Sequence, residues 1–447
     1  MKTLSIIGGG LAGSEAAWQA AKRGIHVDLY EMRPDTSTGA HVSGELAELV
    51  CSNSLGSLLP DRPSGMLIHE MEKLDSLIIK SARKSNVPAG HAFAVDRQKF
   101  SSLITKALNE NPNIKIIREE VIKFPKKPCI IATGPLTSNS FTQVIQDFTG
   151  SENLFFFDAI APTINSETVD MSIAFWGSRY SKNITSEGDY LNCPFSKEEY
   201  DNFVLELIKA HRYPIKGFET EIDSGVNAGK GHFFEGCLPI EVMASRGHRT
   251  LAFGPLRPVG LTNPHLDTKP YAVAQLRRED REGRYLNLVG FQTNLLQKEQ
   301  ERVFRLIPGL SNANFVKFGQ MHKNTFIYSP DILDSTLLSK IDTGIFFAGQ
   351  ICGVEGYLAS AATGLLAGIN AARFLCDQEL FELPTETMIG ALCHRITNSE
   401  NEFFQPVKES FGILPPLDTE IKAKKLRHQK LYEREMEIFN EFFEKIN

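Results

Sequence analysis

A run of glycines near residue 10 has the residue types and spacing that could bind a phosphate group. The run is made of Gly8, Gly9, Gly10, Leu11, Ala12 and Gly13. Gly8 permits a tight turn, Gly10 lets the backbone approach a pyrophosphate, and Gly13 allows a helix to pack closely on the preceding strand. Glu31 follows some 20 residues later, where a carboxylate can accept hydrogen bonds from ribose hydroxyls. These residues predict a dinucleotide-binding site.

The segments around this glycine run have the patterns that such a site requires. Residues 3–7 are nearly all apolar, which predicts a strand buried on both faces, and alanines at helical spacing follow up to Lys22. Gly24 then stands where a left-handed C-cap is expected, and residues 26–30 predict a second strand. The result is one βαβ unit whose helix N-terminus favours a bound phosphate.

A late segment predicts the rest of the cofactor site. Residues 345–350 form an apolar strand that leads into a helix of small residues. Its turn contains Gly349, Gln350, Gly353 and Gly356. Two-dinucleotide-fold flavoproteins use a similar strand, glycine and helix against the ribitol and flavin ring, and the A-T-G turn at 132–134 also resembles theirs. We therefore expect bound FAD in a Rossmann-like, glutathione-reductase-like α/β domain.

The positions of these segments predict a discontinuous FAD-binding domain, formed by residues 1–150 and 331–380. Residues 151–330 contain short aromatic and apolar runs broken by Gly, Pro and Asn, which predicts an inserted mixed α/β domain that faces the substrate. Residues 381–447 predict a helical segment packed on the FAD domain. Because no second G-x-G-x-x-G occurs in the sequence, NADPH or NADH would only visit the flavin.

The composition favours a multidomain globular protein. The chain has 447 residues, 42% hydrophobic and 23% charged, which is long enough for two or three cores. No run approaches the roughly 18 apolar residues that span a bilayer, and the N-terminus has no export signal. We therefore expect a cytoplasmic protein with no membrane partner. The formal net charge of -6 means that an RNA partner would need a local basic surface.

The seven cysteines are scattered, with no C-x-x-C pair, so we expect neither a disulfide framework nor a bound metal. Cys51 lies in C-S-N-S, where an apolar stretch meets small polar residues and would leave the thiol at a turn. Cys237 lies in F-E-G-C-L-P-I-E, between glycine and carboxylates. Taken alone, either cysteine could be structural, because free cysteine is among the most buried residue types.

Together with the glycine run, these motifs resemble the folate- and FAD-dependent tRNA uracil-5-methyltransferase family (TrmFO). Further similar stretches are residues 87–90, 94–97, 253–261, 289–293 and 353–368. The resemblance implies C5-methylation of uridine-54 in the T loop of tRNA, with methylenetetrahydrofolate as one-carbon donor and NADPH or NADH as reductant. It also implies that Cys237 is the nucleophile that adds to uracil C6 and that Cys51, beside the flavin, accepts the C5 proton.

Several alternatives stay open at this point. The same chemistry could act on a ribosomal RNA uridine, and a related family modifies the wobble uridine but has a longer chain. A generic FAD and NAD(P)H oxidoreductase of a small metabolite, or a flavin-stabilised RNA-binding protein without turnover, would need neither cysteine. Candidate RNA contacts are Arg246, Arg277 and Arg278, which could equally be surface charges, and the basic stretch 422–430.

Overall fold

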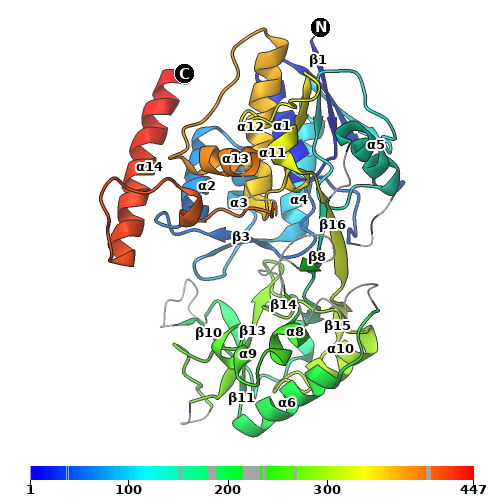
Figure 1. Cartoon of the computed structure of the whole chain (residues 1–447). Helices are drawn as coiled ribbons and strands as arrows, with labels where there is room; N and C mark the ends of the chain where they lie inside the picture. The colour runs from blue at the N-terminus through cyan, green and yellow to red at the C-terminus, as the bar shows by residue number, and fades with distance from the viewer. Residues whose placement is uncertain are drawn as a thin grey trace.

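The structure is a computed structural model of the whole chain. It describes residues 2–36, 38, 40–150, 154–179, 188–214, 232–233, 238–265, 269–398 and 404–446. Figure 1 shows an upper body that contains both ends of the chain and a lower body formed by the middle of the sequence. The two bodies have separate hydrophobic cores.

A five-stranded parallel sheet forms the centre of the upper body. Its strand order is β17 (Ile345–Phe347), β7 (Cys129–Ile131), β1 (Thr3–Ile7), β2 (His26–Glu31) and β6 (Ile114–Arg118). All neighbouring pairs are parallel. Helices cover the sheet, so β7 and β17 are buried along their whole length and consist of apolar residues. The predicted α/β class is confirmed, and β17 joins a sheet begun more than 300 residues earlier.

Helices α1 (Leu11–Lys22) and α12 (Tyr357–Leu375) pack against each other without intervening side chains. A Cβ at Gly364 or Gly368 of α12 would overlap the backbone of Ala12 or Ala16 in α1. By length and composition α12 could cross a membrane, which the sequence alone did not suggest, but 78% of its most apolar window is buried inside the protein. The close packing brings the late segment against the glycine loop.

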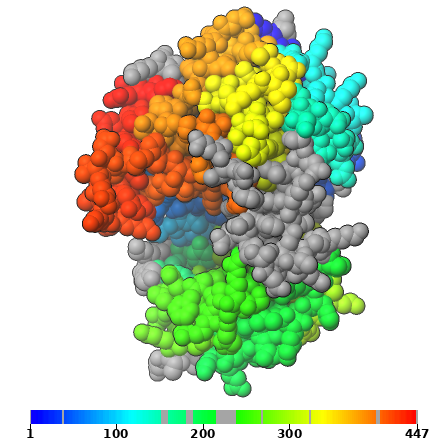
Figure 2. Space-filling model, in the orientation of Figure 1, coloured from blue at the N-terminus to red at the C-terminus, as the bar shows by residue number. Residues whose placement is uncertain are grey.

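The remaining elements of the upper body surround these helices. They are α2 (Pro63–Lys73), α3 (Leu77–Lys84), α4 (Arg97–Asn109), α5 (Asn139–Thr149), α11 (Ser329–Ile332), α13 (Met388–Thr397), α14 (Lys424–Ile446) and a small sheet of β3 (Ser54–Ser57), β5 (Ala92–Val95) and β4 (Asn86–Val87). In Figure 2 the C-terminal residues, in red and orange, cover one side of this body. Leu431 and Phe439 of α14 belong to the same core as the parallel sheet.

A six-stranded sheet forms the lower body. Its order is β10 (Phe175–Gly177), β11 (Tyr190–Phe195), β13 (Ala272–Arg278), β14 (Tyr285–Leu288), β9 (Thr163–Asn165) and β15 (Phe315–Lys317), and all its pairs are antiparallel. One face packs on α6 (Lys197–Lys209), α8 (Ile240–Ser245), α9 (Thr250–Phe253) and α10 (Gln297–Phe304). Its core contains Leu276, Phe203 and Phe304.

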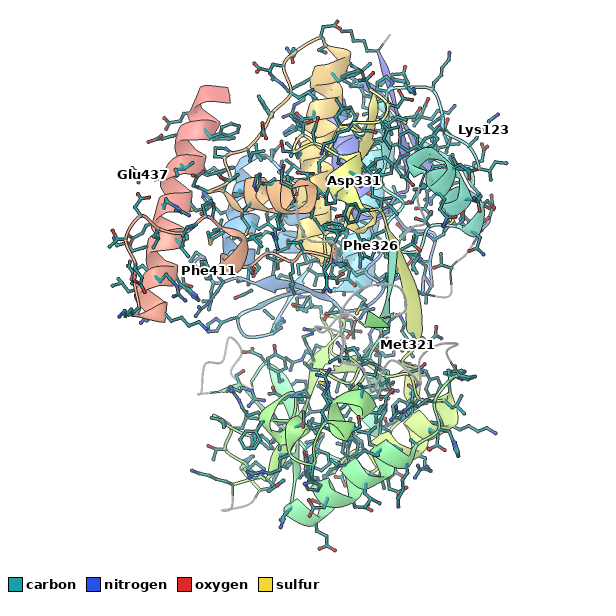
Figure 3. The ribbon with its side chains drawn as sticks, in the orientation of Figure 1. Lys123, Met321, Phe326, Asp331, Phe411 and Glu437 are labelled. Carbon is teal, nitrogen blue, oxygen red and sulfur yellow. The ribbon has the colours of Figure 1, made fainter. Side chains whose placement is uncertain are left out.

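A three-stranded sheet connects the two bodies. It consists of β12 (His232–Phe233), β8 (Leu154–Ala159) and β16 (Met321–Phe326). Strand β16 runs antiparallel to β8. Figure 3 labels Met321 near the lower body and Phe326 in the upper body, so β16 returns the chain from one body to the other.

Candidate cofactor cavity and thiol site

The glycine loop between β1 and α1 has the backbone geometry predicted for phosphate binding. Gly8 has a φ of 103°, and a Cβ there would overlap the carbonyl of Ala132. A Cβ at Gly13 would overlap the carbonyl oxygen of Gly8, so only glycine allows α1 to pack this closely on β1. A Cβ at Gly10, by contrast, would meet nothing within 4 Å. The space beside Gly10, at the N-terminus of α1, is therefore open to a pyrophosphate.

A cavity that is open to solvent adjoins this loop. Of the predicted cofactor-binding residues, the cavity is lined by Gly8, Gly10, Leu11, Ala12, Glu31, Gly349 and Gln350, together with the turn 132–134. The fold thus brings the first βαβ unit, the A-T-G turn and the late segment to one place.

The other four predicted residues do not line the cavity. The Gly9 amide donates a hydrogen bond of 2.9 Å to Glu31, and Gly13 contacts Gly8. Gly353 faces the ring of Phe404, with which a Cβ would collide, and Gly356 has a φ of 95° directly before α12. A Cβ would collide with neighbouring atoms at Gly13 and Gly353, and the positive φ of Gly356 favours glycine. A cofactor contact for these four residues stays a prediction.

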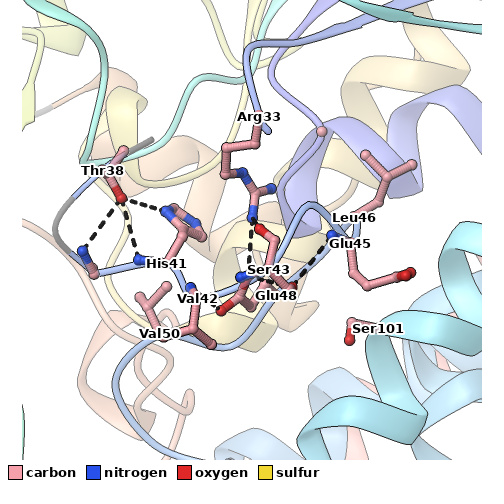
Figure 4. Close-up of polar contacts among 12 residues, drawn as sticks. Arg33, Thr38, His41, Val42, Ser43, Glu45, Leu46, Glu48, Val50 and Ser101 are labelled. Atoms are coloured by element: carbon pink, nitrogen blue, oxygen red, sulfur yellow. Dashed lines mark hydrogen bonds and ion pairs between the residues drawn. The ribbon is translucent and has the colours of Figure 1, made fainter. Parts of the chain in front are cut away.

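Glu31 lies in a network of charged groups on the cavity wall, of which Figure 4 labels Arg33 and Glu48. It accepts hydrogen bonds from the Nε atom of Arg33 at 2.9 Å and from the Gly9 amide, and Arg33 also pairs with Glu48 at 3.2 Å. Burial opposes ionisation of Glu31, but the bonds from Arg33 outweigh burial and hold its pKa below the ordinary value. Glu31 is therefore anionic and can accept a hydrogen bond. Neither Arg33 nor Glu48 was predicted as a residue of the cofactor site.

His41 is a second polar group on the cavity wall that the sequence did not indicate. Its Nδ1 atom lies 2.5 Å from the hydroxyl of Thr38, and both side chains are labelled in Figure 4. Burial, assisted by the charge of Arg33, lowers the pKa of His41 to about 4. The imidazole is therefore neutral at physiological pH.

Cys51 lies beside the cavity, and Tyr357 connects the two. The phenol oxygen of Tyr357 accepts hydrogen bonds from the amides of Cys51 at 2.8 Å and Ser52 at 3.1 Å, and the same side chain lines the cavity. Burial raises the pKa of Tyr357 well above the ordinary value, so the phenol stays protonated. The thiol of Cys51 is only partly buried.

The segment that carries Cys51 is held from both bodies. Arg97 of the upper body donates to the carbonyl of Cys51 at 3.1 Å and forms an ion pair of 2.6 Å with Glu279 of the lower body. Lys317, also of the lower body, donates to the carbonyl of Val50 at 3.3 Å. Cys51 therefore lies at the junction of the two bodies, next to several cations.

Cys237 lies outside the described residues. Of the other cysteines, Cys129, Cys193, Cys352 and Cys393 are buried. Burial raises the pKa of each thiol, to about 12 for Cys129, Cys193 and Cys352, which leaves these thiols protonated and unreactive. Within the described ranges, no group of three or more His, Cys, Asp or Glu residues has a geometry suited to a metal ion.

The parallel sheet, glycine loop and adjoining cavity define a Rossmann-type dinucleotide-fold protein, and comparison with known proteins narrows this class. The family model described as Glucose inhibited division protein A matches residues 3–379. A solved structure of GidA from Aquifex aeolicus has a TM-score of 0.69 and 16% identity, covering 99% of this chain and 73% of that chain. The overall fold is thus the GidA fold.

More similar relatives carry a different name. A protein from Natranaerobius thermophilus is 52% identical over 99% of both chains. One from Aquifex aeolicus is 51% identical over 99% of this chain and 96% of its own length. Both are named methylenetetrahydrofolate–tRNA-(uracil-5-)-methyltransferase TrmFO. The chain belongs to the TrmFO family, which confirms the family predicted from its motifs.

Proposed function

We propose that the protein is a cytoplasmic enzyme that methylates C5 of uridine-54 in the T loop of tRNA. Methylenetetrahydrofolate would supply the one-carbon unit, and NADPH or NADH the electrons. Relatives of about 50% identity are named methylenetetrahydrofolate–tRNA-(uracil-5-)-methyltransferase, which supports the reaction class and the RNA substrate.

FAD is the cofactor that the cavity fits best. The open space beside Gly10 suits its pyrophosphate, and the anionic Glu31 suits a ribose hydroxyl. Gly349 and Gln350 line the same cavity from the late segment and would face the ribitol and flavin. When bound, FAD would carry the one-carbon unit and the electrons to the substrate. The roles of these residues are part of the proposal.

The proposal also assigns a task to each part of the chain. Residues 1–150 and 331–380 would form the FAD domain, residues 151–330 would face the RNA, and residues 381–447 would pack on the FAD domain. The separate hydrophobic cores of the two bodies support this division, because each can fold around its own apolar centre.

Two thiols would activate the uracil ring. In the proposed mechanism, the thiolate of Cys237 adds to C6, and the π electrons of the C5–C6 bond move toward C5 and O4, which makes C5 nucleophilic. After the new carbon–carbon bond forms, Cys51 would take the C5 proton, which releases the methylene group from its carrier. Reduction of that methylene by the electrons of NADPH or NADH would then restore the C5–C6 double bond and expel the thiolate of Cys237. The observation that carries the proposal is the link through Tyr357, which lines the cavity and binds the backbone of the thiol segment.

A comparison within one organism shows that this chain is more similar to TrmFO than to GidA. Aquifex aeolicus has both a TrmFO relative at 51% identity and a GidA protein at 16% identity. The chain covers 96% of the length of the first but only 73% of the second. By identity and length the chain therefore matches the TrmFO relative, whereas a ribosomal RNA target stays an alternative outcome of the experiment.

The test is transfer of isotopic label from methylenetetrahydrofolate to an unmodified tRNA transcript in the presence of FAD and NADPH. We expect label in the C5-methyl group of uridine-54 and none in a transcript with cytidine at position 54. Omission of NADPH and NADH should stop turnover. Label in ribosomal RNA but not in tRNA would move the target, and no label in either RNA would contradict the proposal.

A further inference from the structure

The six-stranded sheet of the lower body has one apolar and one polar face. On β13, Ala274 and Leu276 belong to the core. Gln275 and Arg277, at the alternate positions nearer the C-terminal end of β13, are polar, as are their partners in register on β11, β14 and β9. We call this set the polar face: Thr163, Tyr190, Asn192, Gln275, Arg277 and Asn287. Because side chains alternate along a strand, these residues lie on the side of the sheet opposite the core.

Arg277 differs from its neighbours in the polar face because most of its donors are unused. Gln275 donates to Asn192 at 2.9 Å, and Asn287 donates to the carbonyl of Pro162 at 3.3 Å. The guanidinium of Arg277 has five N–H groups. Among the described residues, its only hydrogen bond runs from Nη2 to the hydroxyl of Ser52, at 2.9 Å. Its Nε atom is buried and has no partner there.

The burial of this guanidinium is costly, and the described residues do not compensate for it with an ion pair of its own. Arg277 is only 7% exposed, so it is not the surface charge that the sequence allowed. Buried charges are normally paired and hydrogen-bonded. The acidic group that acts on it most is Glu279, which is bound to Arg97. A buried cation with spare donors indicates a binding partner that the described part of the chain does not supply.

The position of Arg277 indicates what that partner is. Ser52, which it contacts, follows Cys51 directly, and Cys51 is among the groups that act electrostatically on Arg277. Arg97 and Lys317 hold the same segment. The carboxylates that act on Lys317 are Glu279 and Glu48, which already pair with Arg97 and Arg33. The junction therefore has an excess of positive charge beside a thiol.

We propose that Arg277 is a catalytic residue that donates hydrogen bonds to a carbonyl oxygen of the substrate pyrimidine. The inference rests on the proposed function. When a thiolate adds to C6, a sulfur–carbon bond forms and the π pair of the C5–C6 bond moves toward C5 and O4. The O4 atom becomes partly anionic, and this step needs neither an oxidant nor a reductant. A positioned guanidinium would stabilise this charge in the transition state more than in the ground state.

A ring oxygen fits this site better than an RNA phosphate. Phosphate contacts of RNA-binding proteins are typically made by cations on an exposed surface, whereas Arg277 is buried beneath the Cys51 segment. A flipped base can enter such a site, because enzymes that act on bases take them out of the stack. The two possibilities differ in the measured constant: a ring contact controls kcat, and a phosphate contact controls tRNA affinity.

The experiment compares Arg277→Gln and Arg277→Lys with the wild type, with Arg302→Gln as control. Arg302 is an exposed arginine of the same body, paired with Glu206 and Glu299. Each protein is assayed for bound FAD, for the Kd of unmodified tRNA, and for kcat of label transfer. We expect Arg277→Gln to lower kcat by roughly 10²–10³-fold with FAD content unchanged and tRNA Kd within about twofold. Arg277→Lys should retain intermediate activity, because lysine keeps the positive charge but lacks the planar set of N–H donors of the guanidinium.

Three results would overturn the inference. A kcat of Arg277→Gln within about twofold of the wild type would show that no charge is stabilised there. Weaker tRNA binding with unchanged kcat would make Arg277 a phosphate contact. Loss of FAD in both variants would make it a structural residue. If only Arg277→Gln loses FAD, the role of Arg277 is judged from Arg277→Lys instead, by whether its kcat falls or its tRNA Kd rises. An inactive wild type would contradict the proposed function itself, which distinguishes the two failures.

Discussion

The two large sheets of the protein serve the site in opposite ways. The parallel sheet of the upper body is apolar inside, and its polar functions lie where strands end, at the glycine loop, at Glu31 and at Gln350. The antiparallel sheet of the lower body instead has a polar face along its strands, from Thr163 to Arg277. The parallel sheet can bind a cofactor through backbone groups at the carboxyl ends of its strands. The antiparallel sheet can act on a ligand only through the side chains of its polar face.

Because the upper site depends on close backbone contacts, adding a single Cβ atom to a glycine of its loop should have a large effect. We expect Gly13→Ala to be the most damaging small substitution, because its Cβ would overlap the carbonyl oxygen of Gly8 and separate α1 from β1. The free energy of unfolding should fall by about 3 kcal/mol or more. Gly10→Ala is the matched control, since its Cβ meets open space: stability should be unchanged while FAD affinity falls. Thermal unfolding without FAD and FAD titration would measure both, and equal destabilisation by the two substitutions would contradict the assignment.

The connection between the sheets should depend on the ion pair of Arg97 and Glu279. Replacing Arg97 with Met leaves the carboxylate of Glu279 without its cation and the carbonyl of Cys51 without its donor. We expect a loss of about 3 kcal/mol in the free energy of unfolding, because removing one partner of a buried ion pair leaves the other charge buried and unpaired. The double substitution Arg97→Met with Glu279→Leu should recover part of that loss. Denaturant unfolding checks this, and additive losses would show that the two residues do not interact.

A pH effect should distinguish the cavity wall from the polar face. Burial lowers the pKa of His41 to about 4 from an unfolded value of about 6.5. The unfolded chain therefore takes up a proton first as the pH falls, so stability present above pH 6.5 should be lost between about pH 6.5 and 4. We expect this change to be on the order of 3 kcal/mol and to be absent in His41→Gln. Identical pH profiles of the two proteins would contradict the neutral imidazole.

The smallest effect is expected for the hydroxyl that links the cavity to the thiol segment. Tyr357→Phe removes the acceptor of the Cys51 and Ser52 amides without changing the packing of the ring. We expect a loss of about 1 kcal/mol in unfolding free energy and faster alkylation of Cys51, because its segment is held less firmly. Mass spectrometry after a short exposure to iodoacetamide would measure this rate. An unchanged alkylation rate would mean that Tyr357 does not restrain the thiol segment.

The comparison of the two sheets also explains what the sequence could predict. Backbone chemistry at a strand end requires particular glycines in consecutive order, so Gly8, Gly10 and Gly13 were recognisable as a motif and the α/β fold followed. The role of β17 at the far edge of the same sheet was likewise indicated by its apolar run and Gly349.

The polar face had no comparable signal. Arg277 and Ser52 are 225 positions apart and meet only because β13 packs beneath the Cys51 segment. Arg33, Glu48 and His41 sit in an irregular segment without periodicity, so their convergence on the cavity wall was not foreseeable. The residues 94–97 were noticed as a family motif, but only the structure connects Arg97 to Cys51. The chemical role of Cys237 stays a prediction, because that residue is outside the described ranges.

The most direct test of the account is single-turnover methyl transfer to tRNA in Cys51→Ala, with Cys376→Ala as control. Cys376 is also a partly buried thiol, but it follows the C-terminus of α12, away from the cavity lining. We predict that Cys51→Ala keeps FAD and binds tRNA but gives no C5-methyl product, whereas Cys376→Ala matches the wild type. Normal methylation by Cys51→Ala would contradict the claim that the thiol at the junction of the two bodies takes part in the reaction.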